Sequence, residues 1–158
     1  MNTAKCMLIK EKNPTIEIAT ITEFNLYGVG PFMHHVSEFY PEFDGWLNFK
    51  LLRGLKSGDR KILIVKDNGK IAGLSVLKLT QVENKICTFF VAPEHRGKGY
   101  GTKLMKSSLE HFCGSVDITV CEERNASLYP FLDKNGFQLT SKVEGAYRPG
   151  AKEYYYTR

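Results

Sequence analysis

Apolar positions recur at strand spacing in several segments of the chain. Thr15–Ile21 has the sequence TIEIATI, which alternates as a half-buried strand does. Two apolar, β-branched runs follow at Arg60–Lys66 and Lys70–Leu79, and the Asp67-Asn68-Gly69 turn between them predicts an antiparallel hairpin. Further strands are predicted at Lys85–Val91, Val116–Cys121, Phe137–Val143 and Glu153–Thr157. The first of these is almost wholly apolar, which is typical of a strand that lies mid-sheet and is buried on both faces.

Apolar positions at helical spacing predict about four helices. They cover these ranges: Phe32–Phe39, Asp44–Leu55, Gly99–Phe112 and Asn125–Lys134. The first follows Pro31 within an aromatic segment, residues 24–43, that glycine and proline make irregular and that we expect to be concave. In the second helix Asp44 serves as N-cap, and one face carries Trp46, Phe49, Leu52 and Leu55.

The order of these elements predicts an α/β (α+β) fold, in which a mixed, mostly antiparallel sheet of about seven strands is flanked by about four helices. A chain of 158 residues can fold around a single core, so we expect one domain over residues 1–158. Met1–Glu11 holds only the short apolar patch Met7–Ile9, and no stretch approaches the ~20 apolar residues of a membrane span. We therefore expect a cytoplasmic protein without a membrane partner.

Cysteines and charge narrow the chemistry only slightly. Cys6, Cys87, Cys113 and Cys121 show no CxxC spacing, so we expect free thiols and no metal site, with Cys87 a small hydrophobic residue in its strand. The formal net charge of +5 favours anionic partners. Nucleic acid is one such partner and a cofactor with several phosphates is another, and the basic residues are not gathered into one tract.

The most informative segment is ICTFFVAPEHRGKGYGTKL, residues 86–104, in which a buried strand meets a glycine-rich turn that opens a helix. Gly97, Gly99 and Gly101 allow an incoming group to approach main-chain N–H donors, and a helix N-terminus adds partial positive charge. Arg96 and Lys98 add full charge. The glycine spacing does not match the dinucleotide fingerprint, and no Gly-Lys-Ser/Thr closes the turn as it does in a P-loop.

Two motifs in this order resemble the GNAT superfamily of N-acetyltransferases. The first is Arg96-x-x-Gly99-x-Gly101 after a strand that ends Val91-Ala92-Pro93, and the second is Asn125 with Gly136-Phe137. The predicted element order from Thr15 to Thr157 is that of the superfamily. The resemblance implies the acyl-CoA N-acyltransferase fold, with acetyl-CoA as co-substrate.

The resemblance also assigns cofactor-binding residues. It implies that the pyrophosphate of acetyl-CoA is wrapped by the main chain of Arg96, Gly97, Lys98, Gly99, Tyr100, Gly101 and Thr102. The strand before this turn splays from its neighbour, so the main chain of Phe90 and Val91 is expected to pair with the pantetheine arm. Asn125 matches an asparagine that contacts the pantetheine, and an N-cap role for the following helix is an equally good interpretation.

The catalytic residues are less clearly marked. The superfamily commonly has a tyrosine four residues before the Gly of Gly-Phe, and this tyrosine serves as the acid that protonates the departing thiolate. This chain has Leu132 at that position. Tyr129 lies one turn earlier on roughly the same helix face and is a candidate acid, with a packed aromatic as the alternative. The Val91 N–H is a candidate oxyanion donor. The candidate bases are Glu122, Glu123, His34, His35 and Glu38, although residues of these types at such positions are more often solvated or packing residues.

These observations favour an N-acetyltransferase that moves an acetyl group from acetyl-CoA to a primary amine by direct transfer in a ternary complex. The acceptor is a small metabolite, a peptide or protein amine, or the amine of an aminoacyl-tRNA, as in a toxin-like enzyme. The alternative is a CoA-binding regulatory or interaction module with weakened catalysis, which Leu132 favours. The superfamily contains monomers and homodimers, and the strand at Glu153–Thr157 is a candidate for a sheet edge or an interface.

Overall fold

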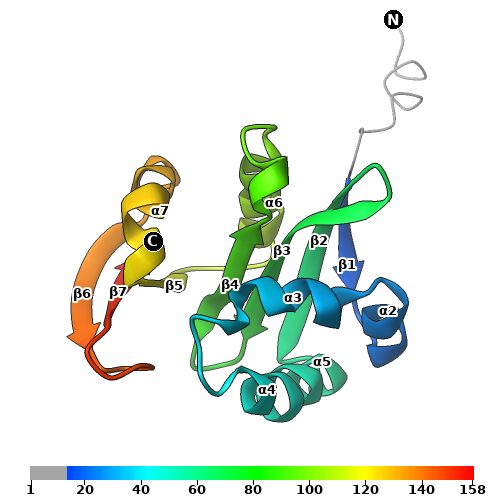
Figure 1. The fold of residues 1–158 in the computed structure, drawn as a ribbon, viewed down its shortest axis with the longest axis horizontal. Coiled ribbons are helices and arrows are strands. Elements are labelled where there is room, and N and C mark those ends of the chain that lie inside the picture. Colours follow the sequence, from blue (N-terminus) through cyan, green and yellow to red (C-terminus); the bar gives the residue numbers. More distant parts are fainter. Residues whose placement is uncertain (1–13) are drawn as a thin grey trace, which may run out of the picture.

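The computed structural model describes residues 14–158, which form one mixed sheet with helices on both faces (Figure 1). The seven-stranded sheet has the order β1-β2-β3-β4-β5-β7-β6. Its strands are β1 Thr15–Ile18, β2 Arg60–Asp67, β3 Lys70–Leu79, β4 Asn84–Val91, β5 Asp117–Cys121, β6 Gln138–Glu144 and β7 Lys152–Thr157. Only the β4–β5 pair is parallel. The predicted fold class is confirmed, and the predictions for Cys6 and for Met7–Ile9 lie outside the described residues.

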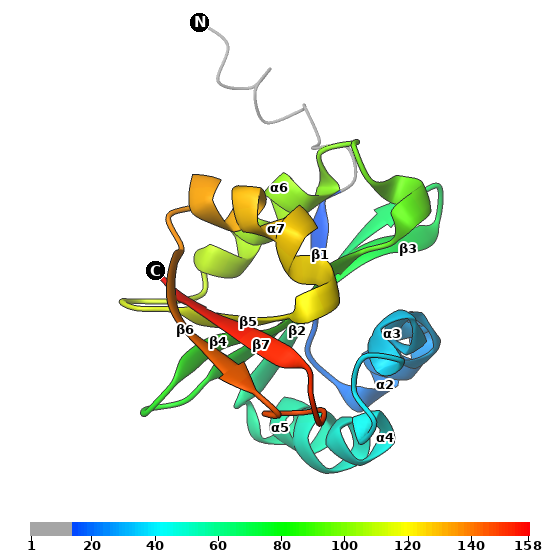
Figure 2. The ribbon, with the colours of Figure 1, turned by 60° about the vertical axis from the view of Figure 1, so that its left-hand side comes forward.

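Helices cover the two faces of the sheet. They are α2 Ile21–Leu26, α3 Val29–Ser37, α4 Phe43–Trp46, a π-helical turn Leu47–Leu51, α5 Leu52–Ser57, a 3₁₀ turn Pro93–His95, α6 Tyr100–Leu109 and α7 Glu122–Lys134. Figure 2 shows α6 and α7 on one side of the sheet and α4 and α5 on the other. Because side chains alternate along β2, Ile62 and Ile64 pack into the core under α2–α5, whereas Leu63 packs into the core under α6 and α7.

The hairpin between β2 and β3 confirms the prediction from Asp67-Asn68-Gly69. Asn68 and Gly69 have φ angles of 50° and 80°. Positive φ at both central residues is the conformation of the tight turns whose twist matches that of paired strands. The turn therefore sets the pairing of Asp67 with Lys70 and of Lys66 with Ile71, and beyond it a β-bulge at Ala72 shifts the register by one residue.

The first predicted strand is too long, because its last residues belong to a helix. The Thr20 side chain accepts a hydrogen bond from the Glu23 N–H at 3.1 Å and so caps α2, a helix that the sequence analysis missed. The strand consequently ends at Ile18. Helix α3 begins at Val29 rather than at Phe32, since Gly28, at φ 69°, precedes it as N-cap.

The predicted helix from Asp44 to Leu55 is divided by the π-helical turn. The extra residue of a π turn rotates the following residues around the helix axis, so a face predicted from regular spacing does not persist. Phe49, predicted to be buried, is 67% exposed, and Leu51 is fully buried in its place. Asp44 lies in the first turn of α4, whose N-cap is Glu42.

Two predictions near the C-terminus are also wrong. Helix α7 begins at Glu122 with Cys121 as N-cap, so Asn125 lies inside the helix and does not cap it. Strand β7 lies between β5 and β6 and is not a sheet edge. Its insertion between two strands that precede it in sequence leaves β6 as the edge, with every residue exposed.

Candidate active site

Strands β4 and β5 separate soon after they pair. Their parallel register covers only Lys85 with Asp117 and Ile86 with Ile118. Immediately beyond, the β3–β4 register passes over Cys87, which is the extra residue of a β-bulge. A bulge bends its strand and increases its twist. The predicted splay is therefore present, and Cys87 and Thr88 are only partly buried, contrary to the prediction of burial on both faces.

The main chain of β4 alternates between its two neighbours. The Ala92 N–H donates to Ala72 of β3 at 2.8 Å, and the Phe90 carbonyl oxygen lies against Gly73 of the same strand. Since successive residues of a strand present their main-chain groups to opposite sides, Val91 faces the opening between β4 and β5, and Phe90 does not.

Two arginines donate hydrogen bonds to the carbonyl oxygens of β4 that face the opening. Arg124 Nη1 donates to the Phe89 carbonyl at 3.0 Å, and Arg96 Nε donates to the Val91 carbonyl at 2.9 Å. Both guanidinium groups also lie over the Phe90 ring, at 5.3 Å for Arg124 and 5.6 Å for Arg96. The opening is therefore positively charged where β4 ends.

The glycine-rich turn lies at the same end of β4. Gly97 and Gly99 have φ angles of 77° and 84°, and a Cβ atom added to either would meet nothing within 4 Å. These left-handed conformations favour glycine, and the space beside them is open. Gly99 is the N-cap of α6, which starts at Tyr100, so the turn and the helix N-terminus form one surface.

Ion pairs hold the turn against the β2–β3 hairpin. Lys98 Nζ and His95 Nδ1 both contact Asp67 Oδ2, at 3.1 and 3.0 Å. The hydrogen bond from Lys98 holds the pKa of Asp67 below its usual value. The side chains of Arg96 and Lys98 therefore bind neighbouring strands, and Thr102 is exposed in the first turn of α6.

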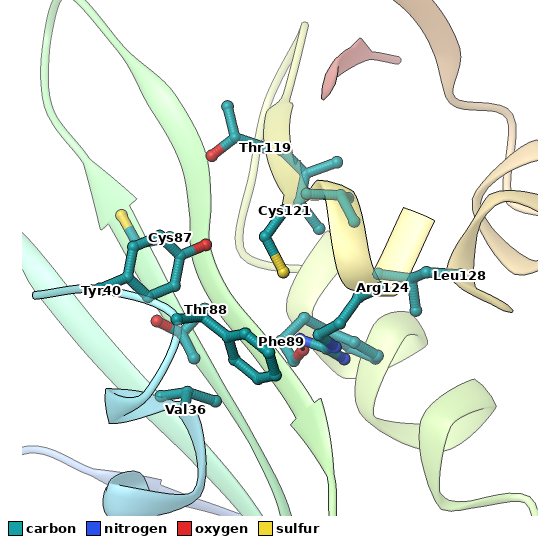
Figure 3. Close-up of a pocket in the computed structure, with 12 residues that line it drawn as sticks. Val36, Tyr40, Cys87, Thr88, Phe89, Thr119, Cys121, Arg124 and Leu128 are labelled. Carbon is teal, nitrogen blue, oxygen red and sulfur yellow. Dashed lines mark hydrogen bonds between the residues drawn. The ribbon is translucent and has the colours of Figure 1, made fainter. Parts of the chain in front are cut away.

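The opening between β4 and β5 is lined by side chains from both strands and from α3 and α7. Figure 3 shows Tyr40, Cys87 and Thr88 on one side of it, with Cys121 and Arg124 on the other. Burial raises the pKa of the Tyr40 hydroxyl strongly, and burial also raises the pKa of the Cys87 and Cys121 thiols. The hydroxyl and both thiols therefore keep their protons at neutral pH.

A larger cavity of about 770 Å³ adjoins this opening on the side of α3 and α4. Tyr40, Cys87, Thr88 and Thr119 line both spaces, so the two spaces adjoin each other. Tyr147, from the loop between β6 and β7, packs edge-on against Tyr40 with ring centroids 5.5 Å apart. The volume lies within the range of about 300–1,000 Å³ for small-molecule sites.

The β6–β7 loop is fastened to α7 beside this cavity. Arg148 donates to both carboxylate oxygens of Glu123, at 2.7 and 2.6 Å. These hydrogen bonds lower the pKa of Glu123 to about 2. Glu123, a candidate base from the sequence, is thus the ion-pair partner of Arg148, and this pair positions Tyr147, which directly precedes Arg148 in the chain.

Glu153 is a buried carboxylate that sequence reasoning missed. It is 1% exposed, and neither carboxylate oxygen has a hydrogen-bond partner among residues 14–158. It lies opposite Cys121 in the β5–β7 register, and such cross-strand partners project from the same face of a sheet. Burial raises its pKa to about 7. The only signal in the sequence is an acidic residue at an inward position of a tyrosine-rich strand.

The remaining predicted site residues are more scattered. Tyr129 is 49% exposed, and Glu122 is exposed with its carboxylate accepting from the Lys152 N–H at 3.4 Å. Neither lines the opening or the cavity, and their catalytic roles stay predictions. Asn125 accepts a hydrogen bond from the Tyr156 hydroxyl at 2.5 Å. Leu132 is fully buried in the core under α6 and α7.

Residues 14–158 contain no group of three or more His, Cys, Asp or Glu side chains that could hold a metal ion. Among the same residues, no helix has the length and apolar character needed to cross a membrane.

Comparisons with known proteins agree with this geometry. The sequence profile of the acetyltransferase (GNAT) family matches residues 24–137. No curated protein matches the chain in sequence. A GNAT-family acetyltransferase from Bacillus cereus superposes with a TM-score of 0.61 at 19% identity, over 91% of this chain and 96% of that one.

Two other solved structures share the fold over a smaller part. Nourseothricin acetyltransferase gives a TM-score of 0.56 at 23% identity, and the match covers 64% of this chain but only 65% of that protein. A GNAT-family acetyltransferase from Elizabethkingia anophelis with acetyl-CoA bound gives 0.51 at 20% identity, over 67% of this chain and 80% of that one. At these identities the likeness concerns the fold alone.

Proposed function

Because the chain belongs to the acetyltransferase (GNAT) family, we propose that it moves an acetyl group from acetyl-CoA to a primary amine by direct transfer within a ternary complex. One observation carries this proposal: the opening between β4 and β5 shares five lining residues with the large cavity on the side of α3 and α4, and the glycine-rich turn follows β4 directly in the chain. Acetyl-CoA and an acceptor amine entering from opposite sides meet between β4 and β5 without an enzyme-bound intermediate.

The main chain around the turn supplies the cofactor site. The backbone of residues 96–102 binds the pyrophosphate, since Gly97 and Gly99 leave it open to an approaching group. The pantetheine arm enters the opening along the main chain of Val91, as the sequence predicts, and of Phe89 in place of Phe90. The carbonyl oxygens of Val91 and Phe89 already accept from Arg96 and Arg124, so the Phe89 N–H is the group that pairs with the arm. The Val91 N–H then stabilises the oxyanion, because a donor fixed in place before the reaction costs no reorganisation.

Two buried groups move the protons. The amine nitrogen attacks the thioester carbonyl carbon, the C–S bond breaks, and the Tyr40 hydroxyl protonates the departing thiolate, the role first given to Tyr129. The second proton of the nitrogen, which is released once the N–C bond has formed, returns to the Tyr40 oxygen. Glu153 lines neither space itself but is the cross-strand partner of Cys121, which lines the opening. Through bridging water it accepts the proton that leaves the ammonium group, the role first given to Glu122. A carboxylate with a pKa near 7 is suited to this task because it balances proton affinity against the fraction present as base at neutral pH.

The cysteines support direct transfer. Cys87 and Cys121 line the opening, but the thiolate is the nucleophilic form and burial raises the pKa of both thiols. Arg60 Nη1 lies 2.8 Å from the Cys87 sulfur, and this nearby charge offsets only part of the effect of burial. An acyl-cysteine intermediate is therefore disfavoured.

A second candidate is a CoA-binding regulatory module. The observation that favours it is Leu132, fully buried at the position where the superfamily commonly has its catalytic tyrosine. The module has the same turn and the same opening as the enzyme, so cofactor binding alone does not separate the two.

Incubation with acetyl-CoA and a panel of primary amines tests the proposal. We expect free thiol to appear only when an amine is present, with the acetylated amine detected by mass spectrometry in equal amount. Tight CoA binding without turnover across small amines, peptides and aminoacyl-tRNA would favour the module and contradict the enzyme. Thiol release at the same rate without any amine would indicate hydrolysis and contradict transfer.

A further inference from the structure

Three cationic side chains lie in a row across β2, β3 and β4. Arg60 is the register partner of Lys78, and Lys78 is the register partner of Lys85. Direct partners in antiparallel strands project from the same face, and all three side chains line the 770 Å³ cavity. The row is therefore one wall of the acceptor side of the site.

Such a row costs stability unless an anion balances it, because like charges directly opposite each other repel. Glu83 balances one of the three: it pairs with Lys78 at 2.6 Å, and this hydrogen bond lowers its pKa. Over the whole cavity, four cationic residues face two carboxylates, and these six are Lys50, Arg60, Lys78, Lys85, Glu42 and Glu83. The wall keeps a positive excess that no described carboxylate lining the cavity neutralises.

On the basis of the proposed function, we infer that the acceptor amine carries an anionic group, a carboxylate or a phosphate, which binds at this row. The acceptor's anion contacts Lys85 and its body runs along β4 past Thr88, so that its amine reaches the opening. Lys85 and Thr88 are three residue steps apart, roughly 10 Å at about 3.3 Å per residue. Trp46 and Tyr147 line the same cavity and cover the apolar body of the acceptor.

Matched acceptors test this assignment. 6-Aminohexanoate and 6-aminohexanamide differ in a charge remote from the amine, and 6-aminohexyl phosphate and 6-aminohexanol form a second such pair. We expect each anion to be acetylated with a kcat/KM about tenfold or more above its neutral partner, since a hydrogen bond to a charged group contributes about 1.5–3 kcal/mol. The better of the two anions identifies the group that the row binds.

Lys85→Gln removes one charge of the row and so tests its contribution to acceptor binding. Lys134→Gln, at an exposed position on α7, is the matched control. Lys85→Gln is expected to lower kcat/KM about tenfold for the anionic acceptors and to leave the neutral acceptors unchanged. Its Tm is expected not to fall, because the substitution relieves repulsion between cations. Lys134→Gln is expected to change neither rate.

Binding without catalysis separates this inference from the proposed function. Hexanoate and hexyl phosphate lack the amine, and we expect one of them to bind the protein with acetyl-CoA present, more weakly to Lys85→Gln. Equal rates for charged and neutral acceptors, or a preference for 1,6-diaminohexane, would overturn the inference and leave acetyl transfer intact. Anion binding at the row without acetylation of any amine would support the anion site while overturning the proposed function.

Discussion

Replacing Glu153 with glutamine removes the charge that is buried most deeply beside the proposed active site. The carboxylate is 1% exposed and has no hydrogen-bond partner among residues 14–158, so its ionised form is poorly solvated. Glutamine has almost the same shape and leaves its amide equally unpaired. The substitution therefore changes mainly the charge.

The pKa of Glu153 sets the size and the direction of the effect. Burial raises it from 4.5 to about 7, so the folded protein holds a proton that the unfolded chain has released between these values. Stability contributed by the protonated form is thus lost as the pH rises from about 4.5 to 7. At 1.36 kcal/mol for each pKa unit, the full cost above pH 7 is about 3 kcal/mol.

Chemical denaturation at pH 5 and pH 8 measures this cost. The unfolding free energy of Glu153→Gln minus that of wild type is expected to be about 2–3 kcal/mol larger at pH 8 than at pH 5. Glu110→Gln, at an exposed position, is the control and is expected to gain nothing. Glu153→Gln is also expected to lower kcat/KM about 10²-fold or more. Its pH–rate profile is expected to lose the acid limb near pH 7. An unchanged stability difference between pH 5 and pH 8 would refute the reasoning about burial, and an intact acid limb would refute the role as base.

Three further substitutions test separate parts of the site. Tyr40→Phe is expected to lower kcat about 10²–10⁴-fold with unchanged CoA affinity, whereas Tyr129→Phe changes kcat little; the opposite ranking in steady-state kinetics would restore the first assignment. Gly99→Glu places bulk and negative charge in the open space beside the turn, and calorimetry is expected to show CoA binding more than tenfold weaker than in Gly99→Ala, the control for backbone strain. Equal CoA affinities of the two folded variants would contradict the phosphate site. Arg148→Ala frees the β6–β7 loop and is expected to raise the acceptor KM several-fold, and a KM equal to wild type would show that the loop does not shape the cavity.

Much of the fold could be predicted because its signals are local. The β2–β3 turn requires positive φ at Asn68 and Gly69, and the residue types show this directly. The turn that precedes α6 is likewise visible as closely spaced glycines after an apolar strand. By contrast, the π-helical turn at Leu47–Leu51 has no sequence signal of its own, and the face that it buries follows from packing against the sheet.

The groups that we propose for proton transfer could not be predicted from the sequence, because their placement depends on contacts between distant parts of the chain. Tyr40 lies beside Thr88 and Cys121 only after α3 packs across the diverging strands. Glu153 is buried only because β7 inserts between β5 and β6. In the sequence one is an aromatic residue beside a proline and the other an acidic residue at a strand end, and neither pattern predicts catalysis.

A crystal structure with coenzyme A bound tests the central claim most directly. The account predicts that the pyrophosphate oxygens lie within about 3 Å of main-chain N–H groups of the turn at residues 96–102, a normal hydrogen-bond distance. It also predicts that the pantetheine arm lies between β4 and β5, with the sulfur near Tyr40. Coenzyme A bound elsewhere, with the space between the two strands filled by the protein's own side chains, would contradict it.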